Sequence, residues 1–107
     1  MNKLQKQELL KVISHEFRRI LGDELDQIVL YGSHARGDAR PDSDLDVLVV
    51  LNGEVDLTHL LRLTSEVIAR LSLENEIVIS RSFISKERFQ NEISPFILNV
   101  RREGIVV

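Results

Sequence analysis

The stretch GSHARGDARPDSDLDVLVV, residues 32–50, decides the fold, because it sets a Gly-Ser turn and several aspartates against the most apolar run in the chain. Residues 45–51 (LDVLVVL) have the composition of a central strand that is covered on both faces. Residues 28–31 (IVLY) are β-branched and aromatic, which predicts a buried strand before the turn. Residues 37–43 between them have the composition of a loop. Two strands joined through an acidic loop therefore form the centre of the predicted domain.

Helices and one further strand are predicted on both sides of this centre. Apolar residues at helical spacing predict a helix over about 3–21 that ends at Gly22, and a second helix that Asp56 caps and that reaches Leu71. Alternation over 76–84 (EIVISRSFI) predicts a third strand. The last elements are short: helices beginning at Ser85 and at Ser94-Pro95, the second ending at Gly104, and an edge strand over 105–107. The order predicts a single α/β (α+β) domain over residues 1–107, with a small mixed sheet and flanking helices.

Composition excludes several classes of protein. The chain has 107 residues, enough for one modest core, and its net charge of −3 provides no basic field for direct nucleic-acid binding. The absence of cysteine excludes disulfides, zinc thiolate sites and thiol nucleophiles, and fits a reducing compartment. The first residues lack the apolar block of a signal peptide, and no window has the apolar length of a membrane span. We therefore expect a soluble, cytoplasmic protein without membrane attachment.

The aspartates at the mouth of the second strand suggest a metal site. Asp44 and Asp46 are two residues apart, so on a strand their side chains point to the same face, with Cα atoms roughly 6.5 Å apart. Two carboxylates on one face repel each other unless a cation lies between them. Mg²⁺ is commonly bound by one or two carboxylates, with substrate phosphates completing its coordination. The spacing therefore predicts a metal platform.

The Gly-Ser turn supplies the complementary half of a nucleotide site. Gly32 allows a phosphate to approach the backbone closely, and Ser33 is a predicted N-cap for a short helical turn over residues 34–36. The Ser33 hydroxyl can also donate to a phosphate oxygen. A metal platform beside a phosphate-binding turn is the arrangement that nucleotidyl transfer requires, because that reaction depends mostly on positioning and charge neutralisation.

Each of these residues also has a purely structural interpretation. Gly32 and Ser33 can simply end a strand and cap a helix, and aspartates are favoured in turns. Arg36 can contact phosphate or form a structural ion pair with a nearby aspartate. Gly37 is expected to adopt a positive φ. His34 is expected to be exposed and not catalytic. Only the joint pattern favours a nucleotide site.

The motif resembles that of a known family. Gly32-Ser33, Arg36-Gly37 and Ser43-Asp44-Leu45-Asp46 resemble the GS…RG…SDxD signature of the DNA polymerase β-like nucleotidyltransferases, and the length is similar to that of the minimal nucleotidyltransferase (MNT) group. The resemblance implies the polymerase β-like fold, with Asp44 and Asp46 as metal ligands. It also implies ATP as substrate, and a triphosphate held by Gly32 and Ser33 with Arg36 and Ser43 among the nucleotide-binding residues.

The sequence departs from the family pattern at the third carboxylate of the site. The family usually has one, commonly Asp, on a neighbouring strand, where it completes a second Mg²⁺ site and helps deprotonate the acceptor hydroxyl. Glu76, at the head of EIVIS, is the candidate for this catalytic and metal-binding position, and it is equally a candidate for a solvated strand start. Its side chain is one methylene longer than that of Asp. Nucleotide binding is therefore better supported than turnover.

Three functions follow from the resemblance. The first is an antitoxin that transfers AMP from ATP to a tyrosine of a partner HEPN-domain ribonuclease toxin. The second is a non-catalytic antitoxin that neutralises its partner by binding alone. The third is the catalytic subunit of a split small-molecule nucleotidyltransferase. The preferred nucleotide, the acceptor and the oligomeric state, self-association included, are not determined by the sequence.

Overall fold

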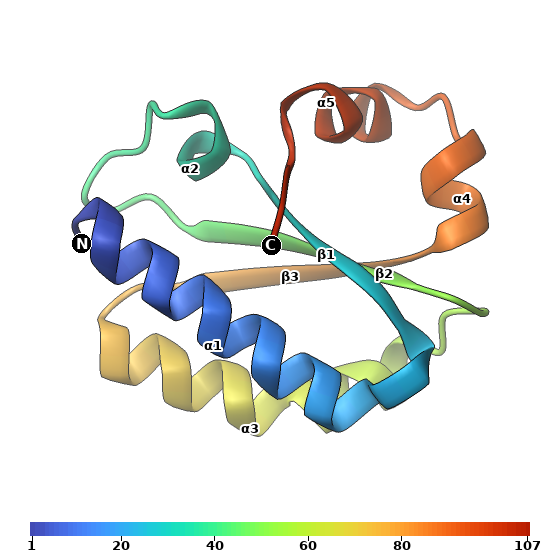
Figure 1. Cartoon of the computed structure of the whole chain (residues 1–107), viewed down its shortest axis with the longest axis horizontal. Helices are drawn as coiled ribbons and strands as arrows, with labels where there is room; N and C mark the ends of the chain where they lie inside the picture. Colours follow the sequence, from blue (N-terminus) through green and yellow to red (C-terminus); the bar gives the residue numbers. More distant parts are fainter.

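The chain folds into a four-stranded mixed sheet with helices on both faces (Figure 1). The computed structural model describes all residues from Met1 to Val107. Its elements in chain order are α1 (Lys3–Leu21), the 3₁₀ turn η1 (Gly22–Glu24), β1 (Leu25–Tyr31), α2 (Ser33–Arg36), β2 (Leu45–Leu51), α3 (Leu57–Asn75), β3 (Ile79–Ser85), α4 (Lys86–Asn91), α5 (Pro95–Glu103) and β4 (Ile105–Val106). The strands lie in the order β3-β2-β1-β4, with β2 and β3 parallel and the other pairs antiparallel.

Strand β2 is central and contributes to two hydrophobic cores. Leu45, Val47 and Val49 pack into the core beneath α1 and α3, which we call the α1/α3 face of the sheet. Leu48 and Val50 pack into a smaller core with Ile97 and Val100 of α5, which we call the α5 face. The prediction of a central strand covered on both faces is confirmed. Because neither face of β2 is solvated, its sequence is almost continuously apolar instead of alternating.

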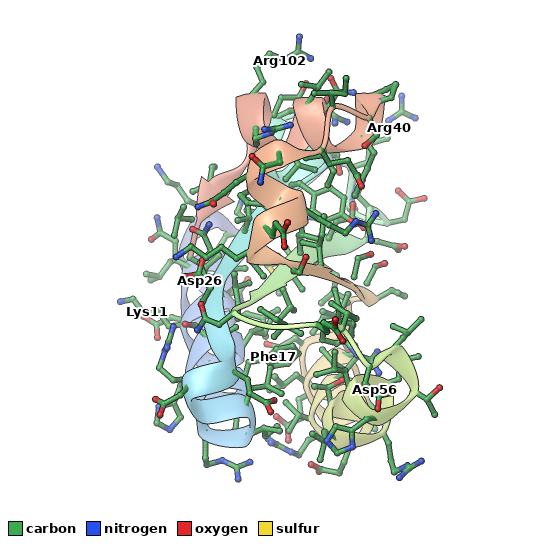
Figure 2. The ribbon with its side chains drawn as sticks, turned by 90° about the vertical axis from the view of Figure 1, so that its right-hand side faces the viewer. Lys11, Phe17, Asp26, Arg40, Asp56 and Arg102 are labelled. Atoms are coloured by element: carbon green, nitrogen blue, oxygen red, sulfur yellow. The ribbon has the colours of Figure 1, made fainter.

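Helices α1 and α3 lie side by side along the α1/α3 face (Figure 1). Phe17 points inward between them and is fully buried (Figure 2). The α1 stripe of Leu9, Ile13, Phe17 and Leu21 has the predicted helical spacing and is buried throughout. An Asn2 capping box begins this helix, and Asp56 begins α3 by accepting a hydrogen bond from the backbone of His59. No helix of the chain has the length and apolarity needed to cross a bilayer.

The short elements are confirmed, and two strands begin at other residues than predicted. Ser85 and Ser94 accept the capping hydrogen bonds of α4 and α5, α5 ends at Gly104, and β4 pairs with the edge of β1. Strand β1 begins earlier than predicted, at Leu25. Helix α3 extends to Asn75, so β3 begins at Ile79 and not at residue 76. The second difference moves Glu76 out of the sheet.

Candidate functional site

The two aspartates lie at the beginning of β2, on the α5 face of the sheet. Asp46 is followed at intervals of two by Leu48 and Val50, which belong to the α5 core, and side chains two apart on a strand share a face. Asp44 precedes the strand by one residue, and Asp46 lies opposite Tyr31 of β1. The charge of Asp44 raises the pKa of Asp46, so the two carboxylates are neighbours, in keeping with the shared face that their spacing predicts.

Neither of these carboxylates forms an ion pair, although the charges of His34 and Arg36 lower the pKa of Asp46 by less than burial raises it. Asp46 is half-buried, and burial raises its pKa above the ordinary value, with a further rise from the neighbouring charge of Asp44. Arg36, the nearest arginine in the motif, pairs instead with Asp38 (Nε–Oδ2, 3.3 Å) and with Glu103 of α5 (Nη1–Oε2, 3.4 Å). Of its two predicted roles, the structural ion pair is therefore present.

Gly32 lies directly against the carboxylate of Asp46. Its φ of 76° and ψ of −157° belong to a region that is essentially restricted to glycine. A Cβ at this position would collide with Oδ2 of Asp46 and lie 3.3 Å from its Cγ. The Gly-Ser turn and the acidic end of β2 are therefore in contact, although Gly32 and Asp46 are 14 positions apart in the sequence.

The structure corrects the capping assignment within this turn. Gly32, and not Ser33, is the N-cap of α2, and its carbonyl accepts from the N–H groups of Ala35 and Arg36. Ser33 is the first helical residue, so its side chain does not cap. The backbone conformation of Gly32, which only glycine adopts readily, makes the sharp turn into α2 one residue before Ser33. Gly37 ends α2 with a φ of 86°, so the predicted positive φ is confirmed.

His34 connects α2 to the residue that precedes Asp44. Its Nε2 lies 3.2 Å from the carbonyl oxygen of Ser43, and its own carbonyl accepts from Nζ of Lys6 at 3.2 Å. Ser43 in turn accepts from the backbone N–H of Arg40 at 2.8 Å through its hydroxyl. The expectation that His34 is simply exposed is wrong, because the ring is half-buried between α2 and the loop. No sequence signal identifies this link, since it depends on how the loop folds back.

Glu76 is not brought together with the two aspartates. It is the exposed C-cap of α3, with a left-handed φ of 53°, and it lies beside Asn75 and Ile77 at the end of that helix. The register of the parallel pair β2–β3 places Ser80 opposite Asp46. Nowhere in the chain do three His, Cys, Asp or Glu side chains form a group that could hold a metal ion.

The donor set present fits one divalent cation. Asp44 and Asp46 provide two carboxylates that form no ion pair within the chain, and the pKa of Asp46 is raised first by burial and then by the charge of Asp44. One or two carboxylates with substrate phosphates is the coordination typical of Mg²⁺. The predicted two-metal site needs a further carboxylate to bind a second ion, and this chain provides none there.

The chain matches the model of the nucleotidyltransferase domain over residues 9–103. It belongs to the nucleotidyltransferase domain family. The match includes the turn, α2 and the two aspartates, so this chain is an enzyme of the nucleotidyltransferase type, and the resemblance seen in the motif is confirmed.

Relatives of this nucleotidyltransferase carry more specific names. It is 30% identical over 105 residues to the "Putative protein adenylyltransferase MJ0604" of Methanocaldococcus jannaschii, covering 97% of this chain and 99% of the relative. It is 36% identical over 73 residues to the "Putative protein adenylyltransferase MJ0141" of the same organism, covering 68% and 73%. A solved toxin–antitoxin structure with AMP-PNP has the same fold, with a TM-score of 0.63 and 18% identity over 92% of this chain and 70% of that one. The predicted polymerase β-like fold is confirmed.

The contact of His34 with Ser43 leads to a testable expectation for this nucleotidyltransferase. His34→Leu removes a hydrogen bond that holds Ser43, and therefore Asp44, against the Gly-Ser turn. A net hydrogen bond contributes about 0.5–1.5 kcal/mol, so we expect transfer to slow by at most about tenfold. His34→Gln retains a side-chain donor and should recover most of the rate. His59→Leu, a change of the same type at an exposed helix position, is the control; equal losses in both leucine variants would contradict the positioning role.

Proposed function

We propose that this nucleotidyltransferase transfers AMP from ATP to a hydroxyl group of a partner protein. The contact between Gly32 and the Asp46 carboxylate carries the proposal. It brings a backbone that a phosphate can approach next to two carboxylates that need a cation, which are the two requirements of a bound Mg-ATP. Adenylyl transfer is also the activity in the names of the two relatives described above.

The site residues divide between the nucleotide and the metal. We propose that Gly32 and Ser33 hold the triphosphate, that Asp44 and Asp46 hold Mg²⁺, and that Ser43 orients Asp44, the residue that follows it. When bound, Mg²⁺ neutralises charge on the phosphate oxygens. Arg36 is half-exposed, and its ion pairs leave part of its guanidinium free to contact a phosphate. The chain itself orients the α-phosphorus so that an acceptor oxygen can attack it and pyrophosphate can leave.

The proposed acceptor is a tyrosine of a HEPN-domain ribonuclease toxin, so that the chain acts as the antitoxin. A structural neighbour that contains AMP-PNP is a toxin–antitoxin assembly, which supports a toxin as the partner class. The acidic site also lies in the open at the end of the sheet, where a protein acceptor has access to it. ATP and such a ribonuclease would both be met in the cytoplasm, which is the compartment we propose.

A non-catalytic antitoxin is the second candidate function. One observation favours it: the chain offers two carboxylates at the site and no third. A protein that only binds and covers its partner needs neither a complete metal site nor an activated acceptor. In that case the Asp44 and Asp46 pair would bind nucleotide without turnover.

Transfer of labelled AMP tests the proposal directly. The chain is incubated with α-labelled ATP and the protein encoded beside its gene, with and without Mg²⁺. We expect label on the partner only when Mg²⁺ is present, and located on a tyrosine by mass spectrometry. Stable complex formation without any label would favour the non-catalytic antitoxin. Label on a small molecule in place of the partner would contradict the protein acceptor.

A further inference from the structure

Strand β3 determines which side chains lie next to the aspartates. Ser80 is directly opposite Asp46, and the N–H of Leu45 donates to the carbonyl of Val78 at 2.9 Å. Ile79 packs into the α1/α3 core, so its neighbours Val78 and Ser80 face the opposite side, the α5 face. The two positions on the neighbouring strand that flank the carboxylate pair are therefore a valine and a serine.

No third carboxylate of the chain lies next to Asp44 and Asp46, where it could act as a general base. Glu76 lies at the end of α3, before the strand begins. Asp38 and Glu103 are paired with Arg36, and Glu103 also contacts Arg102. Asp42 is exposed in the loop before β2 and does not form a three-residue group with Asp44 and Asp46. The remaining candidate base of the motif, His34, has its Nε2 directed at a backbone carbonyl. The site therefore has the groups that hold a nucleotide and its cation, and it has no free base.

The rim of the site is apolar on both sides. Val78 is 61% exposed, and its carbonyl accepts from the N–H of Leu45, the residue that follows Asp44. On the other side, Tyr31 is opposite Asp46 and packs edge-to-face on Phe96 of α5, with ring centroids 5.3 Å apart, and Phe96 is 46% exposed. Such a rim is suited to the surface of a docked protein, which would cover these side chains and reach the aspartates between them.

The chemistry of the acceptor requires a base from somewhere. A tyrosine hydroxyl has an ordinary pKa of about 10, so only about one in a thousand is ionised at neutral pH. A positioned general base typically accelerates such a step by about 10²–10⁴-fold. Free hydroxide is too dilute at neutral pH to replace it.

We propose that the acceptor protein supplies its own general base, a carboxylate or imidazole next to its reactive hydroxyl; this inference rests on the proposed function. The acceptor oxygen forms a bond to the α-phosphorus of ATP while the bond from that phosphorus to pyrophosphate breaks. The hydroxyl proton passes to the base of the acceptor. This nucleotidyltransferase contributes the nucleotide, its orientation and the cation, and the acceptor contributes the activated nucleophile. Acceptor recognition and acceptor activation are then properties of the same docked surface.

Two synthetic peptides and one substitution test this division of labour. The first peptide contains a single tyrosine and no Asp, Glu or His, and the second differs by one histidine next to the tyrosine. We expect the wild-type chain to label the second peptide at least tenfold faster than the first. Val78→Asp places a carboxylate on the α5 face beside Asp44 and should raise labelling of the base-free peptide at least tenfold. Ser80→Asp, opposite Asp46, is the second variant.

Matched controls separate a base from a general effect of substitution. Val78→Asn has the shape of aspartate without its charge and should behave like the wild type on both peptides. Far-UV circular dichroism should give the same fold in all variants, and calorimetric titration with AMP-PNP and Mg²⁺ should give the same affinity in Val78→Asn as in the wild type, because position 78 is exposed and asparagine adds no charge beside the cation.

The outcomes distinguish this inference from the proposed function. Equal labelling of both peptides by the wild type, or no gain in either aspartate variant, overturns the inference while leaving adenylyl transfer in place. Absence of labelling by every variant on both peptides and on the natural partner overturns both. A preference for the histidine peptide that is lost in Val78→Asp confirms that the base is absent from the wild-type chain.

Discussion

Asp46→Asn is expected to abolish nucleotide transfer while raising the melting temperature of the ligand-free chain. The carboxylate of Asp46 is half-buried, lies beside Asp44 and forms no ion pair, and the net effect of its surroundings is to raise its pKa. Asparagine keeps its shape and removes its charge, so the cation loses one of its two anionic ligands. Metal stabilisation of phosphoryl chemistry is worth several kcal/mol, which corresponds to a loss of about 10³-fold or more.

The gain in stability follows from the direction of the pKa shift. Burial and the charge of Asp44 raise the pKa of Asp46 above 3.8, so the unfolded chain releases this proton at a lower pH than the folded chain does. The folded state therefore loses stability as the pH rises from 3.8 through the raised value. The asparagine side chain of the variant would carry no such cost, and its advantage should disappear in acid below 3.8. A lower melting temperature for Asp46→Asn at neutral pH would contradict this account.

The measurements are transfer of labelled AMP, calorimetric titration with Mg-AMP-PNP, and thermal unfolding at neutral and acid pH. Asp42→Asn is the matched control, because it makes the same change at an exposed loop position two residues before Asp44. It should leave all three measurements unchanged. If Asp42→Asn and Asp46→Asn lose transfer equally, the loss reflects net charge and not the site.

Gly32→Ala is expected to have the second-largest effect, on nucleotide binding and on stability together. Its φ of 76° and ψ of −157° cost a residue with a side chain about 1–3 kcal/mol. The added Cβ would also push the Asp46 carboxylate away from the turn, because Oδ2 occupies that space. We therefore expect the free energy of unfolding to fall by about 1–3 kcal/mol and Mg-ATP binding to be lost, with Gly32→Val worse in both respects.

Two further variants separate the backbone strain at position 32 from the collision with the Asp46 carboxylate. Gly53→Ala is the control, because a Cβ there meets nothing within 4 Å. Gly32→Ala combined with Asp46→Ala removes the collision and leaves the backbone strain. The second substitution should then recover part of the stability that the first one loses, as measured by chemical denaturation. Strict additivity of the two changes would show that Gly32 and Asp46 do not touch.

The sequence determined the parts of this protein that depend on local periodicity. Helix α1, strand β2 and the shared face of Asp44 and Asp46 follow from spacings of about 3.6 and 2 residues, which are fixed by backbone geometry. The capping positions of Asp56, Ser85 and Ser94 also follow from short-range hydrogen bonding. These features were predicted correctly because residues within one turn or one strand decide them.

Tertiary structure decided the features that depend on where elements end and how they meet. The segment EIVIS alternates like a strand, yet α3 continues past Leu71, its last buried residue, to Asn75, and Glu76 becomes its cap. The contact of Gly32 with Asp46 and the contact of His34 with Ser43 require the loop between β1 and β2 to fold back. The placement of Val78 and Ser80 beside the aspartates depends on the register of two parallel strands joined by a 19-residue helix. No local pattern encodes that register, because it is set by how the whole helix packs on the sheet.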